Sequence, residues 1–212
     1  MNQDVLKTGT TTVGILCKDG IVLAADKRAS AGYMVADKKA KKVIPINDDI
    51  AITTAGLVSD IQLLTKIIKA QIKLIEIRRG KKISIKQAVN LLSGLVYMNV
   101  RKMSMFQSIV GFLLGGKDST GFHLYNVGID GSLSENDDYV ADGSGMQFAL
   151  GVLEANYTKD MPIAEGVKLA VKTINTAIQR DIATGNGIDV VTITKDGVKF
   201  VLEKELVVKL SV

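Results

Sequence analysis

The order of strand-like and helix-like segments is the feature that most restricts the fold of this chain. Short stretches rich in β-branched residues are bounded by turn signals such as Asp19-Gly20 and Asp196-Gly197. Longer stretches repeat apolar residues every three or four positions, the period of an α-helix. The sequence predicts strands near 10–18, 21–27, 41–46, 50–55, 109–114, 122–127, 138–141, 189–194 and 198–202, and helices near 60–80, 84–102, 147–157 and 163–182.

The first helical stretch carries signals for its buried face and for both of its ends. Ser59 or Asp60 can accept hydrogen bonds from the first free backbone N–H groups. Gly80 can end the helix in the left-handed conformation that glycine tolerates. The apolar residues that recur on one face of this stretch are Ile61, Leu64, Ile68, Ile72 and Ile75.

This block order predicts an α+β fold in one domain. Strands, two helices, strands, two helices and strands do not alternate as they would around a doubly wound parallel sheet. The order suits two mainly antiparallel sheets packed face to face, each covered on its outer side by a helix pair. The expected architecture is therefore a four-layer α-β-β-α sandwich. No linker, repeat or low-complexity stretch divides the chain.

The composition argues against several classes of protein. The 212 residues are 47% hydrophobic and 23% charged, as in an ordinary globular protein. No apolar run reaches the roughly 18 residues of a membrane span, and the first residues lack the apolar centre of a secretory signal. We therefore expect a cytoplasmic protein without a membrane partner. The net charge of +5 is spread over mixed charges and there is no tryptophan, so we expect no nucleic-acid partner.

The single cysteine and the single histidine offer little for metal or cysteine chemistry. Cys17 ends an apolar run and is expected to be a buried structural thiol, because a reactive cysteine needs a polarised and accessible site. His123 has no second histidine to share a metal with, and we interpret it as a structural strand residue. We expect no metal and no cofactor.

The Gly9-Thr10 junction is the part of the sequence that could supply a catalytic nucleophile. If the bond after Gly9 is cut, Thr10 carries both a hydroxyl nucleophile and a free α-amine. An α-amine has a pKa of about 7.7–8.0, against about 10.4 for a lysine side chain, so it is the readier general base at neutral pH. Threonine also favours strands, and by itself the run Thr10 to Thr12 is better explained as the start of one.

Two further patterns bear on the chemistry. Gly143-Ser144-Gly145 is not a dinucleotide-binding loop, because Phe148 stands where that pattern requires glycine. Lys42 precedes an apolar strand and can point inward, where it would need an acidic partner. Asp26, at the end of the apolar run 21–25, is a plausible partner.

Over nearly its whole length the chain resembles the β subunits of the archaeal 20S proteasome. Each matching segment is short, and their order and spacing together make the resemblance specific. The segments are Gly9-Thr10-Thr11-Thr12-Val13-Gly14, Ala25-Asp26-Lys27-Arg28, Ala40-Lys41-Lys42-Val43, Thr54-Ala55-Gly56, Gly143-Ser144-Gly145, Gly151-Val152-Leu153-Glu154 and Gln179-Arg180-Asp181.

The resemblance implies an N-terminal-nucleophile hydrolase that acts as a threonine-type endopeptidase. Such an enzyme would cut itself between Gly9 and Thr10. This cleavage would remove residues 1–9 and leave residues 10–212 as the peptidase domain. Thr10 would be the nucleophile, Lys42 would lower the proton affinity of its hydroxyl, and Asp26 would pair with Lys42. The backbone N–H of Gly56 would face the oxyanion. The polar residues that would hold the α-amine are Ser144 and Asp181, with Thr184 where the family usually has serine.

The resemblance also implies a substrate site and partners. The matched pocket residues are uncharged, which predicts cleavage after apolar or neutral residues, and Ser30 would line the substrate strand. Expected partners are α subunits and other β subunits in stacked seven-membered rings, unfolded polypeptide substrates, and a regulatory ATPase acting through the α ring. The matched pocket residues are Ala29, Ala40, Ile44, Thr54 and Val58.

Three alternatives share this fold. A catalytically silent ring subunit commonly lacks the Gly–Thr junction or the lysine, and this chain has both. The peptidase of the bacterial two-part ATP-dependent protease is normally shorter. A small-amide hydrolase would use the same nucleophile, but the surroundings of Lys42 and Asp181 favour the proteasome.

Overall fold

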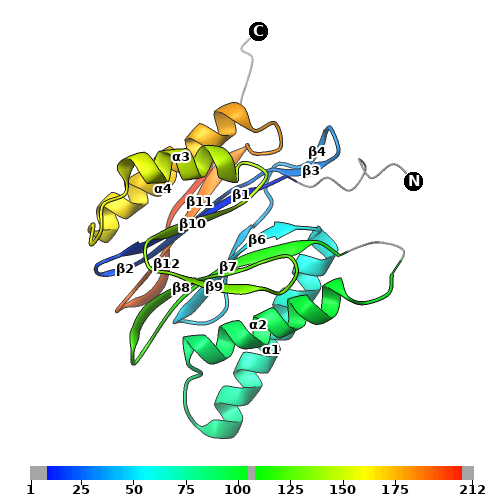
Figure 1. Ribbon diagram of the computed structural model, residues 1–212, viewed down its shortest axis with the longest axis vertical. Coiled ribbons are helices and arrows are strands. Elements are labelled where there is room, and N and C mark those ends of the chain that lie inside the picture. Colours follow the sequence, from blue (N-terminus) through cyan, green and yellow to red (C-terminus); the bar gives the residue numbers. More distant parts are fainter. Residues whose placement is uncertain (1–8, 105–107, 207–212) are drawn as a thin grey trace.

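A computed structural model describes residues 9–104 and 108–206 (Figure 1). Residues 1–8, which make up nearly all of the expected propeptide, lie outside this part of the chain. The described residues form two five-stranded sheets and one short hairpin, and every strand pair is antiparallel. The hairpin consists of β3 (Ala29–Ala31) and β4 (Met34–Asp37).

The first sheet has the strand order β10-β1-β2-β11-β12, and the second has the order β5-β6-β7-β8-β9. The strands of the first sheet are β1 (Thr11–Cys17), β2 (Gly20–Asp26), β10 (Tyr139–Gly143), β11 (Gly187–Thr194) and β12 (Gly197–Glu205). Those of the second are β5 (Val43–Pro45), β6 (Ile50–Gly56), β7 (Val110–Asp118), β8 (Gly121–Val127) and β9 (Leu133–Asn136).

Four helices cover the outer faces of the two sheets. Figure 1 shows α3 and α4 over the first sheet and α1 and α2 over the second, so that the layers run helix, sheet, sheet, helix. The expected four-layer sandwich is confirmed. The helices are α1 (Val58–Arg79), α2 (Ile85–Val100), α3 (Met146–Asn156) and α4 (Ile163–Arg180). None of the described helices is both long and apolar enough to cross a membrane.

Three apolar clusters hold these layers together. One lies between α1–α2 and the second sheet, one between α3–α4 and the first sheet, and one between the two sheets. The middle strand β2 is buried along its whole length, with apolar residues from Ile21 to Ala25, because it has neighbours on both edges and packing on both faces. Its last residue, Asp26, is therefore brought into the interior with no exposed surface.

The helix ends agree with the sequence at some points and differ at others. Ser84 caps α2, accepting a hydrogen bond from the backbone of Gln87, and Gly80 ends α1 with a φ of 64°. The predicted caps Ser59 and Asp60 are wrong, because α1 begins one residue earlier, at Val58. The N-cap position is Leu57, whose backbone N–H bonds instead to the carbonyl of Ile109 beside it.

Candidate active site

Asp26 is the point at which three distant parts of the chain meet. Its Oδ1 atom accepts hydrogen bonds from the backbone of Thr11 (3.0 Å) and from Lys42 Nζ (2.7 Å). Its Oδ2 atom accepts from the backbone of Arg28 and of Gly185, both at 2.9 Å. A carboxylate offers about four acceptor positions, so this buried group is fully hydrogen-bonded.

Lys42 lies just before β5 and points inward, as its position beside an apolar strand predicts. Its side chain is 7% exposed, and its Nζ atom bonds both to Asp26 and to the carbonyl oxygen of Gly9, at 3.3 Å. Burial lowers the pKa of Lys42, and the neighbouring Asp26 carboxylate acts in the opposite direction. The neighbouring Lys41 is exposed. Lys42 is thus a buried cation aimed at the peptide bond that precedes Thr10.

The bond between Gly9 and Thr10 is intact and lies inside this cluster. The hydroxyl of Thr10 donates to the carbonyl oxygen of Gly9 at 2.7 Å, and Thr10 is only 5% exposed. The backbone N–H of Gly9 donates to Ser30 Oγ at 2.9 Å. The Gly9 carbonyl oxygen therefore has two donors, the Thr10 hydroxyl and the Lys42 amine, on the same acceptor atom.

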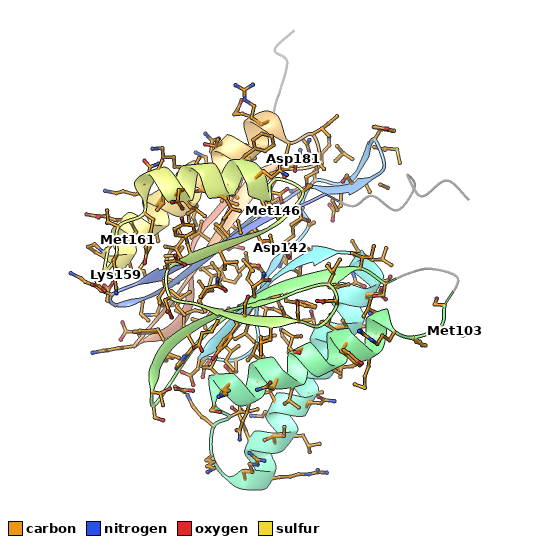
Figure 2. All side chains as sticks on the ribbon, viewed as in Figure 1. Met103, Asp142, Met146, Lys159, Met161 and Asp181 are labelled. Carbon is orange, nitrogen blue, oxygen red and sulfur yellow. The ribbon has the colours of Figure 1, made fainter. Side chains whose placement is uncertain are left out.

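Ser144, Asp181 and Thr184 form a second polar group on the other side of Thr10. Ser144 Oγ accepts from the backbone N–H of Thr10 (3.2 Å) and donates to Asp181 Oδ2 (2.6 Å). Thr184 Oγ1 donates to the same Asp181 oxygen at 2.5 Å. Figure 2 shows Asp181 at the C-terminal end of α4. The expected residues around the Thr10 nitrogen thus lie together, at positions 134 and more residues away in sequence.

Gly56 ends β6 and has a φ of 126°, a conformation that favours glycine. A Cβ at this position would lie 2.0 Å from the carbonyl oxygen of Ile109, so the close approach of the residue that precedes β7 also requires glycine. Among the described residues, the hydrogen bonds to the Gly9 carbonyl oxygen come from Thr10 and Lys42 and not from Gly56. Its expected role toward an oxyanion remains a prediction.

Comparison with known proteins places this cluster in a family. Residues 6–193 match the sequence profile of the family described as "Proteasome subunit". The matched range includes every residue of the cluster. The chain belongs to the proteasome subunit family.

Several archaeal proteasome β subunits are similar to the chain over most of their length. The proteasome subunit beta of Archaeoglobus profundus is 46% identical over 208 residues, which cover 98% of this chain and 94% of that relative. The proteasome subunit beta of Methanocaldococcus fervens is 44% identical, with 96% and 89% covered. The proteasome subunit beta 1 of Thermococcus kodakarensis is 44% identical, with 93% and 95% covered.

The residues matched to the substrate pocket of proteasome β subunits fall into two places. Ile44 and Thr54 lie on the face of β5–β6 that is turned toward α1, and Val58 is the first residue of that helix. Thr54 donates to the carbonyl oxygen of Lys42 through both its backbone N–H (2.9 Å) and its hydroxyl (3.4 Å). The uncharged side chains of Ile44 and Thr54 are therefore held next to the Lys42 segment.

The other matched pocket residues belong to the β3 region. Ala29 and Ser30 lie on β3, and the backbone N–H of Ala40 donates to the carbonyl oxygen of Lys27 at 3.0 Å. Among these three residues, Ser30 is the one with a described hydrogen bond to the Gly9–Thr10 segment. In this β subunit Ser30 thus contacts the residue that precedes the proposed nucleophile.

Sequence reasoning missed three groups that support the cluster. Thr11 Oγ1 hydrogen-bonds to Thr184 Oγ1 at 2.7 Å. The Arg28 guanidinium donates to the carbonyl of Ile182 (2.7 Å) and to Asn186 Oδ1 (2.8 Å), and so fixes the loop that carries Thr184. Lys27 forms a second buried ion pair with Asp189, at 2.5 Å. The only sequence signal for the last two was the charged run at the end of an apolar strand.

Within residues 9–104 and 108–206, no group of three or more His, Cys, Asp or Glu side chains is arranged to hold an ion. Cys17 is buried beneath α4, and burial raises the pKa of its thiol to about 12. His123 lies on β8 with Glu135 Oε1 3.0 Å from its Nδ1 atom. Neither residue belongs to the Thr10 cluster.

Proposed function

We propose that this chain is a threonine endopeptidase that cuts its own Gly9–Thr10 bond and then acts as the catalytic β subunit of a 20S proteasome core particle. The observation that carries the proposal is the double hydrogen bond on the Gly9 carbonyl oxygen, from the Thr10 hydroxyl and from Lys42 Nζ. The nucleophile and a positive charge thus lie at the same peptide bond. Membership of the β-subunit family supports the proposal.

The proposed first reaction is the self-cleavage. Thr10 Oγ1 attacks the carbonyl carbon of Gly9, the C–N bond breaks, and the α-nitrogen of Thr10 takes up a proton as the acyl group moves to oxygen. Water then hydrolyses the resulting ester and releases a carboxylate at Gly9. Lys42 lies where it can stabilise the negative charge that develops on the carbonyl oxygen.

Once it is free, the α-amine of Thr10 is the proposed general base for peptide hydrolysis. An ordinary α-amine has a pKa of about 7.7–8.0, so a neutral fraction exists at neutral pH. The amine accepts the hydroxyl proton, through a water molecule, while Oγ1 attacks the substrate carbonyl. Ser144, held by Asp181, orients the amine. The Gly56 N–H supports the oxyanion, an interaction that is typically worth about 2.7–4 kcal/mol.

We infer that the substrates are unfolded polypeptides, cut after apolar or neutral residues inside stacked rings with α subunits. The uncharged pocket residues support this preference, since none of them would pair with an acidic or basic side chain. Access would be governed by an ATPase acting through the α ring. Peptides ending in leucine or tyrosine should be cut faster than those ending in glutamate or arginine. A faster reaction with the charged peptides would contradict the pocket assignment.

The decisive experiment is an intact-mass measurement of the particle assembled from this chain and an α subunit. We expect the mass of residues 10–212, and we expect Thr10→Ala to keep the full mass under the same conditions. Thr10→Ser, which keeps a hydroxyl, should be processed more slowly. Residues 1–9 retained on the assembled wild-type chain would instead support the second candidate, a catalytically silent β subunit of the same ring.

A further inference from the structure

The carboxyl group of Asp142 lies between the two sheets and outside the Thr10 cluster. It stands on β10, opposite Thr12 of β1, and its neighbour but one, Val140, belongs to the apolar cluster between the sheets. Side chains two residues apart on a strand share a face, so Asp142 also points between the sheets. Figure 2 shows it there.

Two contacts define the position of this carboxyl group. Its Oδ1 atom accepts a hydrogen bond from the backbone N–H of Gly143 at 2.7 Å. Its Oδ2 atom reaches across to the facing sheet and lies against Gly111 of β7, where a Cβ would be only 2.5 Å away. The absence of a side chain at Gly111 therefore makes the room that Asp142 occupies.

No positive charge faces Asp142 from the strands packed against it. β1 (Thr11–Cys17) and β6 (Ile50–Gly56) contain no charged residue, and β7 carries Lys117 and Asp118 only at its far end. The helix packed on β10, α3, carries one charged residue, the acidic Glu154. No ion pair of Asp142 occurs within the part of the chain that the structure describes. Burial raises the pKa of Asp142, and the N–H of Gly143 opposes the effect in part. A carboxyl group placed in this way favours its neutral form.

Asp142 leads directly into the turn that surrounds Thr10. Gly143, with a φ of 96°, packs so closely on the Thr10 carbonyl oxygen that a Cβ there would lie 2.1 Å from it. The next residue, Ser144, accepts the Thr10 N–H, and Gly145 N–H points to the Thr10 carbonyl oxygen at 3.4 Å. A shift of Gly143 would therefore move both hydrogen-bonding groups of Thr10.

We propose that Asp142 is a positioning residue for Thr10: its carboxyl group, seated over Gly111, fixes the Gly143–Ser144 turn and thereby the nitrogen of Thr10. The inference rests on the proposed function only for its effect on catalysis. Asp142 is half-buried, so we expect its carboxylate, once ionised, to turn toward water and away from Gly111. The turn would then lose its anchor, and the geometry around Thr10 would depend on pH through a group outside the Thr10 cluster.

Three variants separate this role from general packing. Asp142→Asn keeps an acceptor for the Gly143 N–H and does not ionise, so it should position Thr10 at every pH. Asp142→Ala removes the acceptor, and Gly111→Ala places a methyl group against Oδ2. We expect both alanine variants to lower kcat about 10-fold or more with little change in KM, since displacements of this kind are costly at an aligned site. Asp142→Asn should restore the rate.

The test compares kcat and KM of the assembled particles from pH 6 to 9, together with amide hydrogen exchange at Gly143 and Ser144. The ratio of kcat for Asp142→Asn to kcat for wild type should rise with pH, and exchange at Gly143 should be faster in Asp142→Ala. A constant ratio together with unchanged exchange would overturn the inference. An inactive wild-type particle would instead refute the proposed function, and the exchange data would still decide whether Asp142 holds the turn.

Discussion

Gly9 packs directly against Ala183: a Cβ placed on Gly9 would lie 1.7 Å from the Cβ of Ala183. The same atom would lie 2.8 Å from the Ala183 Cα and 3.0 Å from its carbonyl oxygen. The loop that carries Thr184 therefore leaves room for glycine alone before Thr10. Any other residue must push this loop or the Gly9 carbonyl away from its place.

Gly9→Ala should consequently slow the self-cleavage. Displacing a reacting carbonyl by about 1 Å can cost on the order of 100-fold in rate, and we expect a loss of that size in a time course of intact mass. Ala183→Gly removes the nearer obstacle but leaves the backbone contacts, so the double variant should recover part of the rate. Equal rates of self-cleavage for Gly9→Ala and wild type would show that the loop moves aside without disturbing the Gly9 carbonyl.

Lys42→Met should abolish cleavage and also destabilise the fold. It leaves Asp26 buried without its cation, and breaking a buried pair typically costs about 3–5 kcal/mol. The three backbone N–H groups that bond to Asp26 remain, so we expect a loss of stability near the lower end of this range. Urea unfolding measures this loss.

The double variant Asp26→Asn/Lys42→Met is the matched control for that loss. It removes the charge as well as the cation, so it should be more stable than Lys42→Met alone and equally inactive. If Lys42→Met unfolds at the same urea concentration as wild type, the pair does not stabilise the fold.

The Lys27–Asp189 pair should matter for stability in the same way but at a different place. Its side chains are 9% and 3% exposed, and the pair joins the end of β2 to β11. We expect Lys27→Met to lower the free energy of unfolding by about 3–5 kcal/mol. The double variant Lys27→Met/Asp189→Leu replaces the pair with apolar groups and should recover most of the lost free energy of unfolding. No recovery would mean that Lys27 acts mainly through its packing against Gly187.

The pH dependence of stability should reveal Asp142. Its pKa is raised above the ordinary value of 3.8 by burial. An acid with a raised pKa supports the fold fully below its unfolded pKa, and that contribution is lost as the pH rises toward the folded pKa. Asp142→Asn does not titrate, so its stability relative to wild type should increase from about pH 4 upward and then level off. Unfolding curves at several pH values measure this difference, and a constant difference would mean that folding does not raise the pKa of Asp142.

The main layers were predictable because their patterns are strongly periodic, whereas three strands were not. β4 is exposed at all four residues and β9 at three of its four, so neither shows the alternation of a half-buried strand. β3 has only three residues. These strands depend on backbone pairing with their neighbours, and their sequences lack the alternation of apolar and polar residues that would predict them.

The residues of the candidate site could be predicted only where their side chains give a signal in the sequence. The pairing of Lys42 with Asp26 followed from two polar residues bordering apolar strands. The backbone N–H of Gly185, which binds the same carboxylate, has no sequence signature, because every residue but proline carries that donor. The fit of Asp142 over Gly111 depends on how the two sheets stack, which neither residue indicates alone.

The hydrogen bonds on Asp26 also bear on when, during synthesis of the chain, the site around Gly9 can form. This one side chain holds Thr11, near the start of the chain, and Gly185, near its end. A ribosome-bound chain that stops short of residue 185 lacks one of the anchors, and the loop that encloses Gly9 does not yet exist. We therefore expect the Gly9–Thr10 bond to become reactive only after almost the whole chain has been synthesised, which would spare the unfinished protein from its own nucleophile.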